Sequence, residues 1–186
     1  MDERKWIERI LAGDTQSFSC LVAKYEKMAY TIALRILENR EEAEEAVQDA
    51  FVKMYRALSD FHFDSKFSTW FYRIVYRTAL TALRQQRMFV SYEEAGPVDL
   101  SNDEVESATA LLEREDRKEM IARTLKKLPA DEALLLTLYY LEECSVEEIC
   151  QITELSASNV KVKLFRGRKR FYEVLQDKMK LETADL

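Results

Sequence analysis

The stretch SKFSTWFYRIVYRTALTALRQQR, residues 65–87, predicts a long helix with two kinds of surface. Ser68 or Thr69 can cap this helix, which we expect to run from about Trp70 to Arg87. Apolar side chains recur along it at helical spacing and supply much of a buried face: Phe71, Ile74, Val75, Leu80 and Leu83. The stretch therefore places one side of a helix against a hydrophobic core.

Aromatic and arginine side chains of the same helix lie partly off that buried face. The rings are Trp70, Tyr72 and Tyr76, and the cations are Arg73, Arg77 and Arg84. For any single residue, a buried ring or a solvated arginine is a sufficient interpretation. Together they combine rings that stack unpaired bases for about 1–3 kcal/mol each with cations that hold phosphates. The cluster thus favours a surface for a single strand of DNA or RNA.

Three further helices are predicted upstream of this stretch. The first covers Asp2 to Ala12 and ends at Gly13, and the second runs from the N-cap Asp14 to about Leu37. The third lies within EEAEEAVQDAFVKMYRAL, residues 41–58, where an apolar stripe recurs at helical spacing. Its polar residues point elsewhere, and spacing alone favours a solvated face over a binding surface.

A second helical unit is predicted downstream. A helix from about Asp103 leads up to Pro129, which suits the first turn of the next helix. That next helix contains EALLLTLYYL, residues 132–141, which is apolar nearly all round and is therefore expected to be central. SVEEICQI, residues 145–152, follows with Ser145 and Glu148 at the spacing of a capping box.

A short helix, the turn TELS and a basic helix then form a helix-turn-helix pattern. One face of the basic helix packs inward: Val160, Leu164, Gly167 and Phe171. Six basic residues and no acidic one lie between Lys161 and Arg170. A run of charge is usually a solvated face, but this run lies on the helix that such a motif places in the major groove. The residues predicted to contact duplex DNA are Ser156, Ser158, Asn159, Lys161, Lys163, Arg166 and Arg170.

The composition predicts an all-α fold without catalytic machinery. Among 186 residues there are three glycines and two prolines, which favours helices joined by short turns. No apolar run approaches the roughly 18–20 residues of a membrane span, and no signal peptide is recognisable, so we expect a cytoplasmic protein. The three cysteines and His62 lack metal-ligand spacing, and neither a phosphate loop nor a nucleophile–base pair is present. We therefore expect no metal, no cofactor and no enzymatic activity.

The net charge of −6 is unevenly distributed along the chain. Residues 1–88 hold 14 basic and 13 acidic residues, whereas residues 89–113 hold seven acidic residues and no basic one. This acidic segment includes EEAGPVDLSNDE, residues 93–104, and marks a domain boundary. We expect two small helical domains, residues 1–88 and 107–186, joined by an acidic linker, residues 89–106.

Two segments, in this order, resemble domains of the extracytoplasmic-function (ECF) sigma factors of bacterial RNA polymerase. AEEAVQDAFVKMYRAL, residues 43–58, with FDSKFSTWFYRIVYRTALTALR, residues 63–84, is similar to their second domain. LPADEALLLTLYYLEECSVEEICQITELSASNVKVKLFRGRKRF, residues 128–171, is similar to their fourth domain. The resemblance implies a promoter-specificity subunit of RNA polymerase. The alternative is a stand-alone helix-turn-helix regulator whose first half serves dimerisation or sensing.

The resemblance also implies roles for individual residues. The third helix would bind core polymerase through Gln48, Asp49, Val52, Lys53 and Arg56. The melted −10 element would be held by Phe63, Asp64, Ser65, Lys66, Phe67, Trp70, Tyr72, Arg73, Tyr76, Arg77 and Arg84. The helix from Ser156 would read the −35 element as duplex DNA, and the acidic linker would thread toward the polymerase active centre.

An anti-sigma factor, often membrane-bound, is a further implied partner, and it would compete with core polymerase for both domains. Three positions depart from the family pattern. Family members usually carry Asn in place of Arg77, Asp or Asn in place of Thr81, and often Gly in place of Glu154. The first departure bears on the −10 base preference. The last predicts a turn without a left-handed glycine, or a changed orientation of the recognition helix.

Overall fold

The computed structural model describes residues 3–90 and 112–184, and within these ranges every regular element is helical. The first half contains α1 (Glu3–Leu11), α2 (Gln16–Leu37), α3 (Arg40–Arg56), a 3-10 turn η1 (Leu58–Asp60) and α4 (Phe67–Val90). The second half contains α5 (Leu112–Lys126), α6 (Ala130–Tyr140), α7 (Val146–Thr153) and α8 (Ala157–Ala184). The predicted all-α class is confirmed. Apart from its first two residues, the expected linker 89–106 lies outside the described residues.

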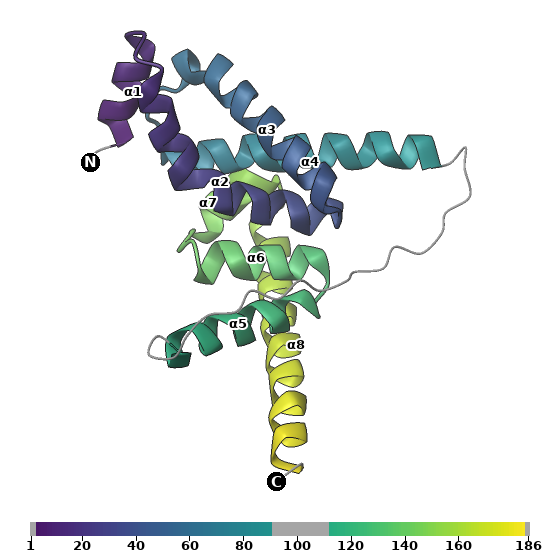
Figure 1. Ribbon diagram of the computed structural model, residues 1–186. Coiled ribbons are helices and arrows are strands. Elements are labelled where there is room, and N and C mark those ends of the chain that lie inside the picture. The colour runs from purple at the N-terminus through teal and green to yellow at the C-terminus, as the bar shows by residue number, and fades with distance from the viewer. Residues whose placement is uncertain (1–2, 91–111, 185–186) are drawn as a thin grey trace.

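In the first half, α2, α3 and α4 pack against one another, and α1 lies on α2 (Figure 1). The apolar faces predicted from helical spacing form its core, in which Leu21, Ile32, Met54, Phe71 and Val75 are fully buried. Together with the other buried residues of α2 and α3, these side chains follow steps of three or four residues, so each helix presents one continuous apolar face to its neighbours.

Two helix starts differ from the expected ones. α4 begins at Phe67, so Ser68 and Thr69 lie inside its first turn instead of capping it. α2 begins at Gln16, two residues after Asp14. Asp14 nevertheless caps this helix, because its carboxylate accepts hydrogen bonds from the Gln16 N–H at 3.0 Å and the Ser17 hydroxyl at 2.9 Å.

In the second half, α6 is central, as its apolar sequence predicted, and Pro129 precedes its first residue. The capping box of Ser145 and Glu148 starts α7. Glu154 ends α7 in a left-handed conformation, with φ 62°, so the turn keeps the backbone shape that glycine commonly provides. Gly167 lets α8 approach α6 closely, since a Cβ there would lie 3.2 Å from Leu136 Cδ1.

The two halves pack against each other. α4 contacts α7 and α2 contacts α6, and the first of these interfaces is the larger. Figure 1 shows α7 below α4 and α6 below α2, with the long α8 extending away from the first half. A third connection joins α2 to α5, because Arg35 Nη1 donates to the Leu125 carbonyl at 3.3 Å. Local sequence patterns did not predict this arrangement.

Candidate nucleic-acid and protein interfaces

The predicted polymerase-binding residues share one exposed face of α3. Gln48, Asp49, Val52, Lys53 and Arg56 are all exposed. Within this face Lys53 lies 3.9 Å from the Asp49 carboxylate and donates to the Thr78 hydroxyl at 3.3 Å. The third helix thus brings all five side chains together in contact with solvent.

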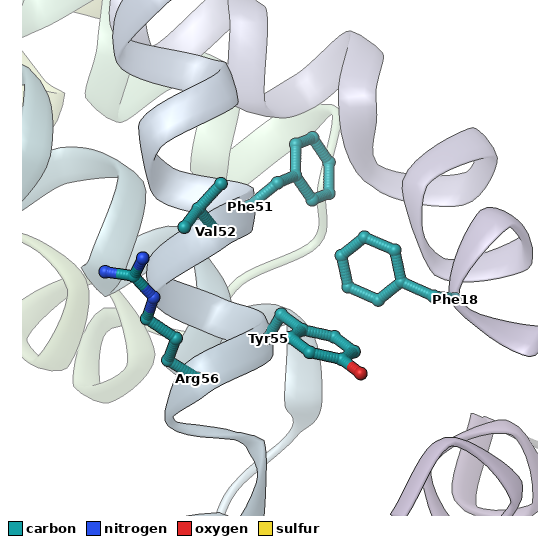
Figure 2. A pocket seen from close by; sticks show the side chains of 5 residues that line it. All are labelled: Phe18, Phe51, Val52, Tyr55 and Arg56. Carbon is teal, nitrogen blue, oxygen red and sulfur yellow. The ribbon is translucent and has the colours of Figure 1, made fainter. Parts of the chain in front are cut away.

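An apolar groove of about 460 Å³ adjoins this face. It is lined by Phe18 of α2 together with Phe51, Val52, Tyr55 and Arg56 of α3 (Figure 2). The Phe18 ring lies edge-on to Tyr55 at 5.1 Å and to Phe51 at 6.4 Å. Sequence reasoning missed Phe18 and Tyr55 as surface residues. The position of Tyr55 in the sequence did indicate exposure. The residue lies outside the apolar stripe that contains Met54, and it directly precedes Arg56 of the predicted polymerase-binding set.

The loop before α4 exposes one phenylalanine ring. Phe63 is 40% exposed and adopts a left-handed φ of 61°, which is uncommon for a bulky side chain. Its ring packs on Phe61 at 4.8 Å, and the Arg4 guanidinium lies 4.9 Å from its centroid. Phe67, also a predicted −10 residue, is only 3% exposed and belongs to the core. Of the other predicted loop residues, Asp64 and Lys66 are exposed and Ser65 is half-buried.

The three rings predicted to stack on bases differ in exposure. Tyr72 is 2% exposed, and its hydroxyl donates to the Glu142 carboxylate at 2.8 Å, so burial and this acceptor raise the pKa of Tyr72. Trp70 is half-buried against Phe61 at 5.1 Å and Phe67 at 5.5 Å. Tyr76 is half-buried as well, and burial raises its pKa.

The basic residues of α4 are divided between solvent and the second half. Arg84 is exposed, and Arg73 is half-buried. Arg77 pairs with Glu154, which ends α7, through an Nε–Oε1 distance of 2.7 Å. The three predicted −10 cations of α4 therefore lie along one helix, but Arg77 already has an anionic partner within the chain.

The predicted −35 residues lie at the start of α8 and along its outer side. Ser156, Ser158, Asn159, Lys161 and Arg166 are exposed, and the Ser156 hydroxyl caps the helix by accepting from the Asn159 N–H at 3.3 Å. Two further predicted contacts are tied to α6 instead. Lys163 pairs with Asp131, and Arg170 Nη1 lies 2.9 Å from Glu132 Oε1.

Other kinds of site find little support in the described part of the chain. Residues 3–90 and 112–184 hold no cluster of three or more His, Cys, Asp or Glu side chains arranged to bind a metal ion. Within the same ranges, no helix combines the length and the apolar character that a bilayer crossing requires. The surfaces that remain are the α3 face with its groove, the α4 face and the basic side of α8.

Comparison with known proteins identifies two family segments in this chain. Residues 21–88 match Sigma-70 region 2, and residues 118–171 match Sigma-70, region 4. The chain is 32% identical over 181 residues to the RNA polymerase sigma-H factor of Pseudomonas aeruginosa, covering 94% of each protein. It is 31% identical over 169 residues to the ECF RNA polymerase sigma-E factor of Escherichia coli, covering 87% of this chain and 88% of that protein.

Solved structures share the fold. The sigma factor RpoE of Bartonella quintana, in complex with the anti-sigma factor NepR, matches with a TM-score of 0.70 at 18% identity, over 87% of this chain and 98% of that one. CnrH, in complex with the cytosolic domain of CnrY, matches with a TM-score of 0.60 at 21% identity, over 94% and 97% of the two chains.

Proposed function

The chain belongs to the ECF sigma factors of bacterial RNA polymerase, and from this membership we propose which of its surfaces does what. As a sigma factor it directs promoter-specific transcription by RNA polymerase. In this proposal the half that contains the first family segment handles the −10 element, and the half that contains the second handles the −35 element. We propose domain limits of residues 1–88 and 107–186.

The exposed face of α3 is the proposed docking surface for core polymerase. Its five residues are exposed and adjoin an apolar groove, which extends the area that a partner could cover. The observation that carries this assignment is the continuity of Val52 and Arg56 with the groove, since both residues belong to the face and to its lining.

The two DNA elements are assigned to α4 and α8. In this proposal the loop Phe63–Phe67 and the outer side of α4 hold the melted −10 strand, and the start of α8 reads the −35 duplex. A chain of net charge −6 releases few counterions on DNA, so it depends on polymerase for non-specific affinity. The chain itself catalyses no reaction and needs no cofactor in this role, and it acts in the cytoplasm, where polymerase meets the chromosome.

An anti-sigma factor that competes with core polymerase is the second proposed partner. The family implies such a regulator. Of two proteins with the same fold, RpoE has been solved with the anti-sigma factor NepR and CnrH with the cytosolic domain of CnrY. A stable ternary complex of chain, anti-sigma factor and core polymerase that still initiates transcription would contradict this competition.

Run-off transcription with purified core polymerase across a promoter library tests the function, and two variants test the assignment of surfaces. Asp49→Ala is expected to weaken core binding about tenfold, because it removes a charge from the docking face. Arg166→Ala is expected to spare core binding and to lower promoter recognition about tenfold, because it removes a contact to the major groove of the DNA.

Glu26→Ala on α2, also exposed, is the matched control for both variants. Loss of core affinity in Arg166→Ala but not in Asp49→Ala would reverse the assignment, and tight core-independent binding to a palindromic duplex would favour a stand-alone regulator.

A further inference from the structure

A cation from the N-terminal helix lies on the exposed phenylalanine ring of the loop before α4. Arg4 of α1 places its guanidinium carbon over the Phe63 ring, 4.9 Å from the ring centroid. The Arg4 Nε also lies 3.1 Å from Glu8 Oε1, one turn further along α1. This ion pair orients the guanidinium, and the face of an aromatic ring attracts a cation. No residue of α1 belongs to the −10 set predicted from the sequence.

The start of α1 is fixed relative to this loop. The Glu3 carboxylate accepts a hydrogen bond from the Tyr25 hydroxyl of α2 at 2.5 Å and pairs with Lys24. Ile7 and Ile10 are buried in the core, and α1 contacts η1, which directly precedes the loop. The helix is therefore an anchored element, from which the next side chain after Glu3 can hold the ring in one place.

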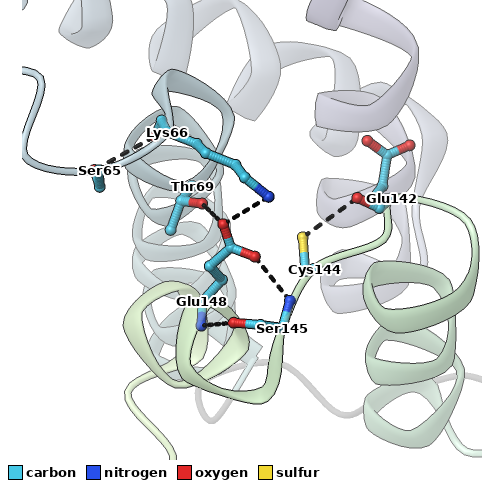
Figure 3. A network of polar contacts seen from close by, with 7 residues as sticks. All are labelled: Ser65, Lys66, Thr69, Glu142, Cys144, Ser145 and Glu148. Atoms are coloured by element: carbon cyan, nitrogen blue, oxygen red, sulfur yellow. Dashed lines mark hydrogen bonds and ion pairs between the residues drawn. The ribbon is translucent and has the colours of Figure 1, made fainter.

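The loop itself is anchored on both sides of Phe63. On one side, Phe61 is 7% exposed, and its ring packs on Phe63 at 4.8 Å. On the other side, Lys66 Nζ lies 3.0 Å from Glu148, and the Thr69 hydroxyl lies 3.5 Å from the same carboxylate (Figure 3). Between these points Phe63 keeps its left-handed φ of 61°. A bulky residue adopts this costly conformation only where its surroundings enforce it, and such residues concentrate at binding sites.

Arg4 and Phe63 together offer two kinds of contact to an unpaired nucleotide. Unpaired bases stack on aromatic rings and on guanidinium planes, and a nearby cation attracts the phosphate. Phe63 is 40% exposed and the Arg4 side chain is 64% exposed, so the stacked pair is open to solvent. A base that stacks on the guanidinium would extend the stack that the ring and the cation already form.

We propose that Arg4 belongs to the −10 site: it positions the Phe63 ring, and its guanidinium forms the platform on which one unpaired base of the melted strand stacks. The inference rests on the proposed role of the loop Phe63–Phe67 in holding that strand. It extends the strand-binding surface from the loop to α1, and its ligand is a base as well as a phosphate.

The test asks, position by position, whether Arg4 contacts a base. Holoenzyme assembled with the full chain is titrated with a fluorescent fragment of a promoter identified by run-off transcription, in which the −10 region is already unpaired. One nucleotide of the non-template strand at a time is replaced by an abasic nucleotide, which keeps the phosphate and removes the base. Arg4→Ala is expected to bind the intact fragment about fivefold more weakly than the parent chain. At one abasic position the two chains are expected to agree within about twofold, because the base that stacks on Arg4 is missing there.

Two further variants separate stacking from charge. Lys5→Ala removes the same charge from the neighbouring exposed position of α1 and is expected to stay within about twofold of the parent chain on every fragment. Arg4→Lys keeps a cation over the ring but lacks the guanidinium plane, so it is expected to bind the intact fragment about threefold more weakly. Both Arg4 variants are expected to keep the parent affinity for core polymerase, because the proposed docking surface lies on α3. If Arg4→Ala misfolds, the abasic comparison with Arg4→Lys decides the question by itself.

Three results would overturn the proposal. Equal losses in Arg4→Ala and Lys5→Ala would reduce the effect to net charge. Full recovery by Arg4→Lys would show that no stacking plane is needed. A loss that persists at every abasic position would show a contact to phosphate alone.

Transcription separates this inference from the proposed function. Each of these three results leaves the sigma function intact as long as holoenzyme with the parent chain initiates. Failure of the parent chain to bind core polymerase or to initiate would overturn the function itself.

Discussion

α3 and α4 pack side by side in the same half of the molecule, yet their predicted binding faces differ in accessibility. All five predicted residues of α3 are exposed, whereas on α4 Tyr72 is buried, and Thr69 and Arg77 are bonded to the second half. The residue pattern of a binding surface therefore describes what the surface is made of. Whether the surface is free depends on what the rest of the chain packs against it.

Physical chemistry explains why the second half covers one face and not the other. A tyrosine hydroxyl buried without an acceptor costs about 1–3 kcal/mol, and Glu142 supplies the acceptor for Tyr72. The donors of α4 thus find complementary anions within the chain. Among the described residues, the apolar groove beside α3 has no such internal partner, and Val52 and Tyr55 remain 47% and 46% exposed.

The largest expected effect tests whether α3 is the open docking face. Val52→Asp is expected to lower the affinity for core polymerase about hundredfold, because it places a charge without a partner in an interface that excludes water. Competition for core polymerase against a labelled parent chain measures this effect. Strand binding by the free chain should not change, since Val52 lies away from α4.

The control for this variant is Ala23→Asp, which adds the same charge to an exposed position of α2. It is expected to keep core affinity within about twofold of the parent chain, as surface substitutions usually do. If both variants lost core affinity equally, net charge would explain the loss, and the contrast between α3 and α4 would disappear.

A smaller effect is expected at Tyr72, where the ring and the hydroxyl have separate roles. Tyr72→Phe keeps the ring for stacking and removes only the hydrogen bond to Glu142. Loss of a hydrogen bond worth about 1 kcal/mol should favour a form in which the second half has moved off α4, and so tighten binding of a single strand by about fivefold. Fluorescence anisotropy without polymerase measures this change.

Tyr30→Phe is the matched control, since Tyr30 is half-buried on α2 and belongs to neither surface. It should leave strand binding unchanged. Weaker strand binding by Tyr72→Phe would show that the hydroxyl contacts the strand and does not hold the second half against α4.

The sequence predicted the helices well because their apolar side chains recur at the helical period. The capping box of Ser145 and Glu148 and the inward face of α8 at Val160 and Leu164 are local patterns, and both were confirmed. The start of α4 was wrong by about three residues. Thr69 was one of the two predicted caps, but its hydroxyl instead donates to Glu148, 79 residues away.

The packing of the two halves could not be predicted in the same way. It depends on pairs such as Tyr72 with Glu142 and Arg77 with Glu154, which lie 70 and 77 residues apart. Judged by its neighbours in the sequence, each residue of these pairs resembles an ordinary charged or aromatic surface residue, and only the fold brings the two together. Local sequence also failed to predict the partners of two residues on α8. Lys163 and Arg170, predicted to contact DNA, pair with acidic residues of α6.

The smallest expected effect concerns the ion pair between Arg77 and Glu154, two of the residues that depart from the family pattern. A double-mutant cycle with Arg77→Ala and Glu154→Ala is expected to give a coupling of about 0.2–1 kcal/mol in the free energy of unfolding, because both side chains are more than half exposed. The coupling should fall toward zero at about 1 M salt, where the Debye length is near 3 Å. The surface pair Arg4 and Glu8 on α1 gives the matched cycle for an ion pair within one helix. If the Arg77–Glu154 coupling persisted at high salt, the pair would be held by desolvation and packing, and strand phosphates could not displace Glu154 by charge alone.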